Sequence, residues 1–412
     1  MNGRRHFLLA VVVLATLTVA MPSPASVGED AAELRVLTFN VWHGLRSGES
    51  KTKFPGEDEE RKARRFAWQI DLMRELAPDI LFLQEVNPNQ REARSYAEAL
   101  GYEEIHKVTS CGIHLPPIKI PKNVNDGLAI LARPGLNLRR VQTKRLSGDA
   151  KCTATFGFQT KESRYVLLGE ITVDGKKILL ATTHLSAPFW VPKGFEENLE
   201  RLVADEVLTE EQRGRIVDTL ARRRARNLGE TQKLLAQIER YREKLSKDGR
   251  PVPVLLGGDF NTEPDTAPIA AIVDSGLQIV ATGPDYLTWD PVKNHENQAI
   301  GSRRGWPVPT YDLEEVVKLL EPRRTTARQI DYLFISERID VISSKMSMDQ
   351  DRNGLFPSDH FAIFAVIGVE DGKQLPRFCA ATQATADDGR SSPAALCPYD
   401  PSCCPLPATT RK

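Results

Sequence analysis

The sequence predicts an α+β fold in which two mixed or antiparallel β-sheets pack face to face and helices cover their outer sides. Short, apolar, β-prone runs are numerous, whereas long helical stretches are few. The Asp174-Gly175 pair between two such runs is a strong hairpin signal. Strands and helices do not alternate as strictly as in a Rossmann-type sheet, and the chain has no G-x-G-x-x-G or G-K-[ST] loop to hold a nucleotide.

The first half of the chain is predicted to hold most of the strands. Residues 34–41 form the first strand, and the polar residues 46–60 form a loop over the predicted site. A helix follows over residues 61–76, because apolar residues recur there at helical spacing and Pro78 ends it. A second helix covers residues 91–100 and closes at a glycine. The remaining strands predicted in this half are residues 80–86, 128–132, 156–159, 165–173 and 178–183.

A long, charged helical stretch over residues 198–246 changes the pattern. Its last part carries apolar residues that we expect to pack on a sheet. Its first part, within a helical insertion at about residues 191–225, is either a hairpin beside the site or a solvated helix pair without function. Beyond it we predict a helix at residues 268–275 and strands at residues 252–256, 329–335 and 361–369.

A secretory signal peptide is predicted over residues 1–25. Arg4 and Arg5 precede an apolar run too short for a comfortable membrane span, and Ser23 and Ala25 suit cleavage. An uncleaved N-terminal anchor is the alternative. The protein is therefore expected to be secreted or periplasmic, with one domain over residues 34–369 and a Cys/Pro-rich tail over residues 371–412 with little regular structure.

Charge and cysteine content narrow the possible functions. Lys+Arg and Asp+Glu both number 55, so the chain has no global attraction for nucleic acid or anionic membranes. Six cysteines without a C-x-x-C pair favour disulfides over a zinc site in an exported chain. We expect Cys111 and Cys152 to pair, because both lie in one loop-rich stretch. The tail holds Cys379, Cys397, Cys403 and Cys404.

Five polar segments stand at the ends of predicted strands. They are Thr38-Phe39-Asn40, Gln84-Glu85, Thr183-His184-Leu185, Gly258-Asp259-Phe260-Asn261 and Ser358-Asp359-His360. A strand that ends in an acid, amide or imidazole delivers that group to the edge of a sheet, so five such segments indicate one shared pocket. Carboxylates, amides and histidines without a thiol suit Mg²⁺-assisted chemistry on a phosphate.

Several of these residues favour chemistry over a structural role. Glu85 follows an apolar run that implies burial, and burying a carboxylate is costly unless it is paired or binds a metal. Asn40 has the same placement at the end of the first strand. Asp259 and Asn261 lie on one face of an extended strand. One can orient or deprotonate a water and the other can hold a phosphate oxygen, although an Asx turn would give the same pattern.

Two histidines also stand at strand ends. His360 follows Asp359, and Asp331 precedes another strand, so a carboxylate is available to fix the tautomer of the imidazole and support its charged form. His184 is suited to donate a hydrogen bond to a phosphate oxygen. An isolated histidine at a strand end is usually structural, but two of them with an Asp partner favour catalysis.

The combined motifs resemble the endonuclease/exonuclease/phosphatase superfamily of deoxyribonuclease I-like and neutral sphingomyelinase-like phosphohydrolases. The matching segments are TFNVW, LFLQEV, DGLAILAR, TTHLSA, GGDFNTEP, QIDYLFIS and SDHFAIFAVI. The resemblance implies a four-layered α/β sandwich and a hydrolase that requires Mg²⁺ or Mn²⁺. It implies that Glu85 is the main metal ligand, with Asn40 beside it and Asp359 close by. Some members carry an Asp where Trp42 stands here, so a second metal site is not implied.

The resemblance also implies catalytic roles for the other strand-end residues. His360 would be the imidazole at the scissile phosphate, with Asp331 as its orienting partner. Asp259 would activate or position the water. Asn261 and His184 would stabilise the charged transition state, where preorganised donors matter most.

Two further regions are candidates for substrate binding. Trp289 and Asn294 lie in the segment YLTWDPVKN, where an aromatic ring can stack on a base or sugar; a packed loop anchored by Trp289 is the alternative. A phosphate-facing patch or an ordinary charged surface is formed by Arg303, Arg304, Arg323, Arg324 and Arg328.

We therefore expect a secreted phosphodiesterase whose substrate is nucleic acid or a phospholipid headgroup. We expect it to act as a monomer without an obligatory protein partner. The alternatives are a phosphomonoesterase of the inositol-phosphate type and a non-catalytic binding protein on the same scaffold.

Overall fold

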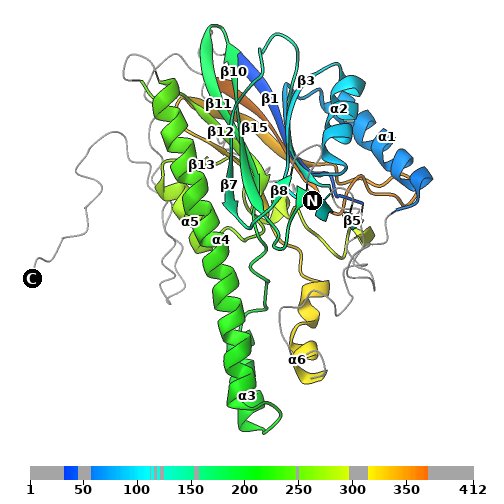
Figure 1. Ribbon diagram of the computed structural model, residues 1–412, viewed down its shortest axis with the longest axis vertical. Helices are drawn as coiled ribbons and strands as arrows, with labels where there is room; N and C mark the ends of the chain where they lie inside the picture. Colours follow the sequence, from blue (N-terminus) through cyan, green and yellow to red (C-terminus); the bar gives the residue numbers. More distant parts are fainter. Residues whose placement is uncertain are drawn as a thin grey trace, which may run out of the picture.

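Two six-stranded β-sheets face each other in the centre of the molecule (Figure 1). The computed structural model describes residues 32–44, 57–111, 113–115, 118–120, 125–152, 157–246, 250–296 and 314–369. The predicted signal peptide, most of the polar loop at residues 46–60 and the predicted tail lie outside these described residues, as do Arg303 and Arg304.

Both sheets are mixed. The first has the order β15 (Ile339–Ser347), β16 (Ala362–Val369), β1 (Ala32–Asn40), β2 (Ile80–Val86), β6 (Gly127–Ala132) and β3 (Glu103–Val108). The second has the order β13 (Gln278–Ile279), β14 (Asp331–Ile335), β12 (Val254–Asp259), β11 (Lys176–His184), β10 (Arg164–Val173) and β7 (Arg139–Ser147). The pairs β1–β2 and β11–β12 are parallel, and the other neighbours are antiparallel.

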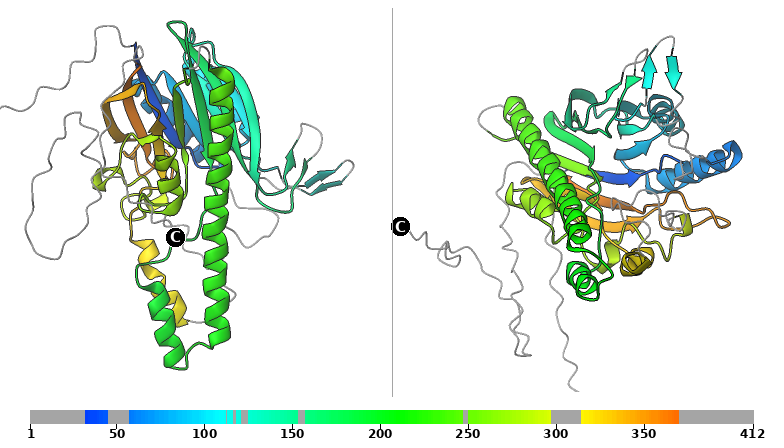
Figure 2. Two further views of the ribbon diagram at one scale, coloured as in Figure 1. Left: turned by 90° about the vertical axis from the view of Figure 1, so that its left-hand side faces the viewer. Right: turned by 60° about the horizontal axis from the view of Figure 1, so that its bottom comes forward.

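Helices cover the outer face of each sheet, which gives the four layers that the sequence predicts. Helices α1 (Glu59–Leu76) and α2 (Asn89–Leu100) cover the first sheet, and α4 (Glu210–Leu245) and α5 (Ala267–Asp274) cover the second (Figures 1 and 2). The predicted α+β sandwich is confirmed. Among the described helices, none is both long and apolar enough to cross a membrane.

The central core lies between the two sheets and is closely packed. Leu34, Ile80 and Phe82 of the first sheet meet Leu167, Leu180 and Leu255 of the second. Gly257 of β12 lies against the ring of Phe82, where an added Cβ atom would stand 2.5 Å from Cδ2 of that ring. The sheets therefore lie in close contact just before the polar ends of β2 and β12.

Local signals account for several of these boundaries. The side chain of Asp58 accepts a hydrogen bond from the Arg61 N–H and so caps the start of α1, and Gly101 ends α2 in the left-handed conformation. Asp174 and Gly175 join β10 to β11 with positive φ values of 49° and 78°, which is the backbone required by a tight hairpin turn.

The long helical stretch is divided in two. Helix α3 (Phe195–Ala204) ends before Thr209, and a capping box between Thr209 and Gln212 starts the 36-residue α4. The first half of α4 leaves the sheet and, with α3 and α6 (Glu314–Leu319), projects from the sandwich (Figure 2). Leu199, Ile216 and Val316 give this projection a small core of its own.

A small separate sheet extends from the other side of the molecule (Figure 2). Its order is β5 (Ile118–Ile120), β4 (Ile113–Leu115), β9 (Gly157–Phe158) and β8 (Lys151–Cys152). Cys111 and Cys152 form a disulfide in this region, with their Cα atoms 5.7 Å apart. This is the pairing expected from their common loop-rich stretch. The other four cysteines lie outside the described residues.

Candidate active site

The second sheet aligns three predicted site residues side by side. His184 at the end of β11 pairs in register with Asp259 at the end of β12, and Asp259 pairs with Asp331 at the start of β14. Residues opposite each other on neighbouring strands direct their side chains to the same face. Gly257, two residues before Asp259, faces the first sheet, so these side chains also face the first sheet.

The first sheet supplies Asn40 and Glu85 from the neighbouring strands β1 and β2. Asn40 pairs with Gln84, and the register of β2 against β6 shifts between Leu83 and Val86. Glu85 lies in this irregularity with a φ of 57°, a conformation that costs energy for any residue except glycine. The local distortion turns Glu85 out of the regular alternation of the strand, and its Oε2 accepts a hydrogen bond from the His43 N–H at 3.1 Å.

The turn before β16 holds His360 against Asp331. The Ser358 hydroxyl donates to the Asn40 carbonyl at 2.6 Å and accepts from the His360 N–H at 3.1 Å, which ties this turn to the end of β1. The Nδ1 of His360 lies 2.8 Å from Oδ2 of Asp331. Burial alone would lower the pKa of His360, but Asp331, with Asp359 and Asp259 nearby, raises it well above its usual value.

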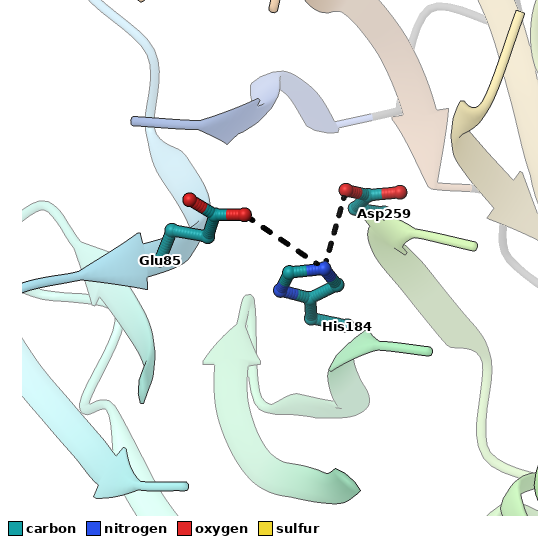
Figure 3. Close-up of side chains that lie close together, drawn as sticks. All are labelled: Glu85, His184 and Asp259. Carbon is teal, nitrogen blue, oxygen red and sulfur yellow. Dashed lines mark ion pairs between the residues drawn. The ribbon is translucent and has the colours of Figure 1, made fainter. Parts of the chain in front are cut away.

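Asp259 stands at the centre of the group. Its Oδ2 accepts a hydrogen bond from Asn40 Nδ2 at 3.0 Å and lies 3.5 Å from Nε2 of His184 (Figure 3). The same oxygen lies 3.9 Å from Nε2 of His360. Burial, together with the negative charge of Asp331, raises the pKa of Asp259 to about 8. This carboxyl group is therefore inclined to hold a proton when no cation is bound.

Burial and neighbouring charged groups also shift the pKa values of His184 and Glu85. The imidazole of His184 lies between the carboxylates of Glu85 and Asp259, 3.9 Å from Oε1 of Glu85 (Figure 3). Burial and the nearby Arg164 guanidinium lower the pKa of His184 well below its usual value. Burial would raise the pKa of Glu85, but the positive charge of neighbouring histidines, His43 first, lowers it to about 2.

A divalent cation fits this donor set. Ligand atoms of Glu85, His184 and Asp259 all lie within 4.8 Å of one another. Asp359 is buried, and its burial raises the pKa of its carboxyl group to about 6, with a further contribution from the charge of Glu85. Buried carboxylates that repel one another are the arrangement that a hard, oxygen-seeking cation such as Mg²⁺ relieves. The predicted ligand Asn40 lies at the same place, although its Nδ2 is directed to Asp259 and its Oδ1 accepts from the Trp42 N–H.

The remaining predicted residues differ in their distance from this centre. Asn261 adopts a φ of 54°, donates its backbone N–H to Oδ1 of Asp259 at 2.9 Å and directs its Nδ2 to the Leu185 carbonyl at 3.0 Å. Trp289 is almost fully buried and forms a backbone bridge with Arg328. Asn294 is fully buried, donates to the Ser358 carbonyl and accepts from the Glu296 N–H. The structure thus gives Asn294 a supporting position behind the turn before β16 in place of the substrate-facing position that we predict.

Sequence reasoning missed two charged residues near this site. Oδ1 of Asp126 is buried without a hydrogen-bond partner among the described residues, and burial, assisted by Glu85, raises its pKa to about 6. Arg164 begins β10, is 8% exposed, and lies close enough to His184 and Asp126 to affect their pKa values. Asp126 directly precedes the apolar strand β6, and Arg164 is the first residue of β10. A search for charged residues at the starts of apolar strands could therefore have found both.

Comparison with known proteins places these observations in a family. A model described as the Endonuclease/Exonuclease/phosphatase family matches residues 37–360. Protein angel from Drosophila melanogaster is 27% identical over 135 residues, which are 32% of this chain and 36% of that protein. The match thus spans about a third of the length of this curated relative.

Solved structures with a similar chain path come from several organisms. An endonuclease/exonuclease/phosphatase family protein from Bacteroides thetaiotaomicron has a TM-score of 0.49 at 16% identity, covering 84% of this chain and 99% of that one. The human Nocturnin catalytic domain with bound sulfate has a TM-score of 0.46 at 17% identity, covering 82% and 95%. D. rerio TDP2 complexed with a single-strand DNA product has a TM-score of 0.45 at 15% identity, covering 82% and 99%.

Proposed function

This chain belongs to the endonuclease/exonuclease/phosphatase family of phosphoester hydrolases, and we propose that it is a secreted, divalent-metal-dependent phosphodiesterase acting on nucleic acid or a phospholipid headgroup. One observation carries the proposal. The His360–Asp331 pair and Asp259 meet Glu85 where the polar ends of both sheets converge. A positioned imidazole, a water-orienting carboxylate and an anionic metal ligand are the groups that attack of water on phosphorus requires.

Glu85, Asp359 and Asn40 are the residues that would hold the metal. His184 and Asp259, which lie close to Glu85, would instead take part in the proton and charge transfers. A bound Mg²⁺ or Mn²⁺ ion would polarise a phosphoryl oxygen and neutralise part of the charge that develops on it. The negative charge of Glu85 contributes to the raised pKa of the buried Asp359, and relief of this repulsion by a cation supports the assignment. Both residues are carboxylates, which bind through hard oxygen atoms, so hard cations are favoured.

Asp259 and His360 would carry the proton and charge transfers. Oδ2 of Asp259 is the oxygen that can orient an attacking water and accept its proton, and Asn40 and His184 hold this oxygen in place. Asp331 occupies Nδ1 of His360, so Nε2 is the nitrogen that can donate to the phosphate. A positively charged His360 and the amide of Asn261 would stabilise the added charge of the transition state.

The test is turnover of a small phosphodiester, bis(4-nitrophenyl) phosphate, by protein loaded with Mg²⁺ or Mn²⁺. We expect steady release of nitrophenolate that stops when excess chelator is added and returns with metal. The monoester 4-nitrophenyl phosphate, assayed in parallel, separates a phosphodiesterase from a phosphomonoesterase. Absence of turnover with either ester would favour a non-catalytic binding protein.

A panel of natural substrates then narrows the substrate class. Plasmid DNA, RNA, sphingomyelin vesicles and inositol phosphates cover the candidate substrates. Export is checked by mass spectrometry of secreted material, where we expect a chain that begins near Ser26 with its cysteines oxidised. Light scattering on the same material checks the expected monomer.

A further inference from the structure

A cavity of about 440 Å³ lies directly beside the proposed reaction centre. Asn261, which bonds to Asp259, forms one side of it, and Ile330, which precedes Asp331, forms another. Helix α4 and the segment around Trp190 close the far side. The cavity therefore adjoins the proposed reaction centre through Asn261 and through Ile330, the sequence neighbour of Asp331.

The cavity is lined by a buried guanidinium that stacks on aromatic rings. The Arg328 guanidinium lies 4.3 Å from the ring centre of Trp289 and 5.0 Å from that of Trp190. Behind the cavity wall, the Arg323 guanidinium lies 3.9 Å from the ring centre of Phe189. These two arginines belong to the group of five for which the sequence allows two interpretations. The group is either a phosphate-facing patch or an ordinary charged surface.

Within the described residues, neither guanidinium has an ion-pair partner. The Nε atoms of Arg323 and Arg328 are buried without a hydrogen-bond partner there. Burial and the proximity of other arginines lower the pKa of each to about 10. Buried positive charge is costly. The nearby carboxylate of Glu263 offsets part of this cost for Arg328, and an anion at the two guanidinium groups would offset the remainder.

The remaining lining suits a planar group with hydrogen-bonding edges. Trp190 exposes an indole ring to the cavity, and its side chain donates a hydrogen bond to Glu263. Glu263 is a half-buried carboxylate that can accept from an N–H or O–H of a ligand. Indole rings stack on nucleobases with about 1–3 kcal/mol per base.

We propose that this cavity is a subsite for a nucleotide unit, with the base against Trp190 and a phosphate at Arg328. The inference rests on the proposed phosphodiesterase function and names its substrate class as nucleotidyl. A choline headgroup is disfavoured, because the positive charges of Arg328 and Arg323 would repel a quaternary ammonium. The helical insertion supplies Arg224 and Ala225 to the cavity, so the insertion determines specificity.

The first test uses calorimetry to measure how tightly defined probes bind to the metal-loaded protein. Adenosine 5′-monophosphate should bind about tenfold more tightly than ribose 5-phosphate, since a stacked base contributes about 1–3 kcal/mol. Phosphocholine and inositol trisphosphate should bind more weakly than adenosine 5′-monophosphate. Equal affinity for the nucleotide and for ribose 5-phosphate would overturn the subsite.

The second test alters the subsite in two independent ways. Arg328→Gln removes the charge, and Ala225→Phe fills the cavity from an exposed position on α4 without disturbing a packed core. Both should weaken binding of adenosine 5′-monophosphate about tenfold. The matched control is Arg352→Gln, which removes a guanidinium 3.7 Å from the Trp68 ring, remote from the site. If a folded Ala225→Phe protein binds adenosine 5′-monophosphate as tightly as the parent does, the proposal is rejected, even if Arg328→Gln fails to fold.

Turnover distinguishes failure of this inference from failure of the proposed function. Ala225→Phe should raise the KM for a dinucleotide about tenfold and change kcat less. Oligomers of DNA and RNA, compared with the dinucleotide, show whether the unit is taken as a free nucleotide or as part of a strand. Hydrolysis of bis(4-nitrophenyl) phosphate without a KM effect of Ala225→Phe on the dinucleotide rejects the subsite alone, whereas no hydrolysis of any diester rejects the function.

Discussion

The backbone of Glu85 departs from the regular geometry of strand β2. A regular β2 would direct consecutive side chains to alternate faces, yet Gln84 and Glu85 are displaced by the irregularity against β6. Oxygen atoms of Glu85 thereby reach the His43 N–H and the imidazole of His184. The strained φ of 57° is maintained because the other residues of β2 are buried and the neighbouring strand β6 is buried throughout.

Replacing Glu85 by Gln should reduce turnover by on the order of a hundredfold or more while keeping the fold. The amide has the same shape but lacks the charge that a hard cation requires. Calorimetric titration of Mg²⁺ and the rate on bis(4-nitrophenyl) phosphate measure the two effects together. The control is Glu210→Gln, since the Glu210 side chain is 76% exposed at the start of α4. Parental metal affinity in a folded Glu85→Gln protein would show that Glu85 is not the ligand.

Loss of the imidazole at position 360 should be equally damaging. His360→Ala should lower kcat by on the order of a hundredfold or more, the usual effect of removing a positioned proton-transfer or charge-stabilising group. Asp331→Asn should cost less, because the imidazole stays in place but loses its charge support at 2.8 Å. Saturating metal and circular dichroism of each variant exclude effects of metal loss or misfolding. A folded His360→Ala enzyme that works at the parental rate contradicts the assignment.

At the scale of elements, the close approach of the two sheets positions the site. Gly257 allows β12 to lie against Phe82, and two residues later Asp259 faces the end of β1. A side chain at position 257 would separate the sheets at the point where their polar ends must meet.

Gly257→Ala should therefore destabilise the protein by about 1–3 kcal/mol, the usual cost of overpacking a core. Urea denaturation followed by fluorescence gives the change in free energy of unfolding. Gly229→Ala on α4 is the matched control, because an added Cβ atom there meets nothing within 4 Å. This control should be neutral or stabilising by up to about 1 kcal/mol. A fully stable Gly257→Ala protein would mean that the sheets can separate freely.

The elements also show where sequence patterns were sufficient. Strand β2 was predicted with its observed bounds, and β12 was predicted at residues 252–256 but spans Val254–Asp259. Both were found because burial on both faces requires continuous apolar runs. Strand β7 was missed, since its sequence RRVQTKRLS is mostly polar and lies at the sheet edge, where burial imposes little pattern. The cavity beside Trp190 could not be foreseen, because it is created by packing between α4 and a loop distant in sequence.

The candidate site was predictable as a set of residues and less so as a geometry. Asn40, Asp259 and His184 converge as expected from strand ends of two sheets. The inward position of Asn294 depends on which backbone groups it meets in three dimensions, and sequence spacing carries no such information.

At the scale of the whole molecule, the buried charges make stability depend on pH and metal. Raised pKa values of about 8 for Asp259 and about 6 for Asp359 mean that the folded state binds more protons than the unfolded chain above about pH 4. The stability of the metal-free protein should therefore fall as the pH rises from about 4 to about 8. The raised pKa of His360 acts in the same direction, and the lowered pKa of His184 opposes it.

Metal binding should remove this dependence. Mg²⁺ replaces the protons that the carboxyl groups hold, so the rise in melting temperature on adding Mg²⁺ should be larger at about pH 8 than at about pH 5. Differential scanning fluorimetry with chelator or with millimolar Mg²⁺ measures it. The Glu85→Gln protein should lose most of the metal effect. An equal Mg²⁺ shift at both pH values would mean that the metal does not bind at these carboxylates.

The position of β16 has a consequence for the moment at which activity arises. This strand is the last in the described chain, yet it lies between β15 and β1, with Val369 opposite Ala32. Asp359 and His360 immediately precede it, so a ribosome has already produced Glu85, His184 and Asp259 before the imidazole that completes the site exists. On the proposed mechanism, a nascent chain that has not yet reached His360 would lack this imidazole and would not hydrolyse a phosphoester. The proposed activity would therefore arise only after β16, the last strand of the described residues, has paired with β1.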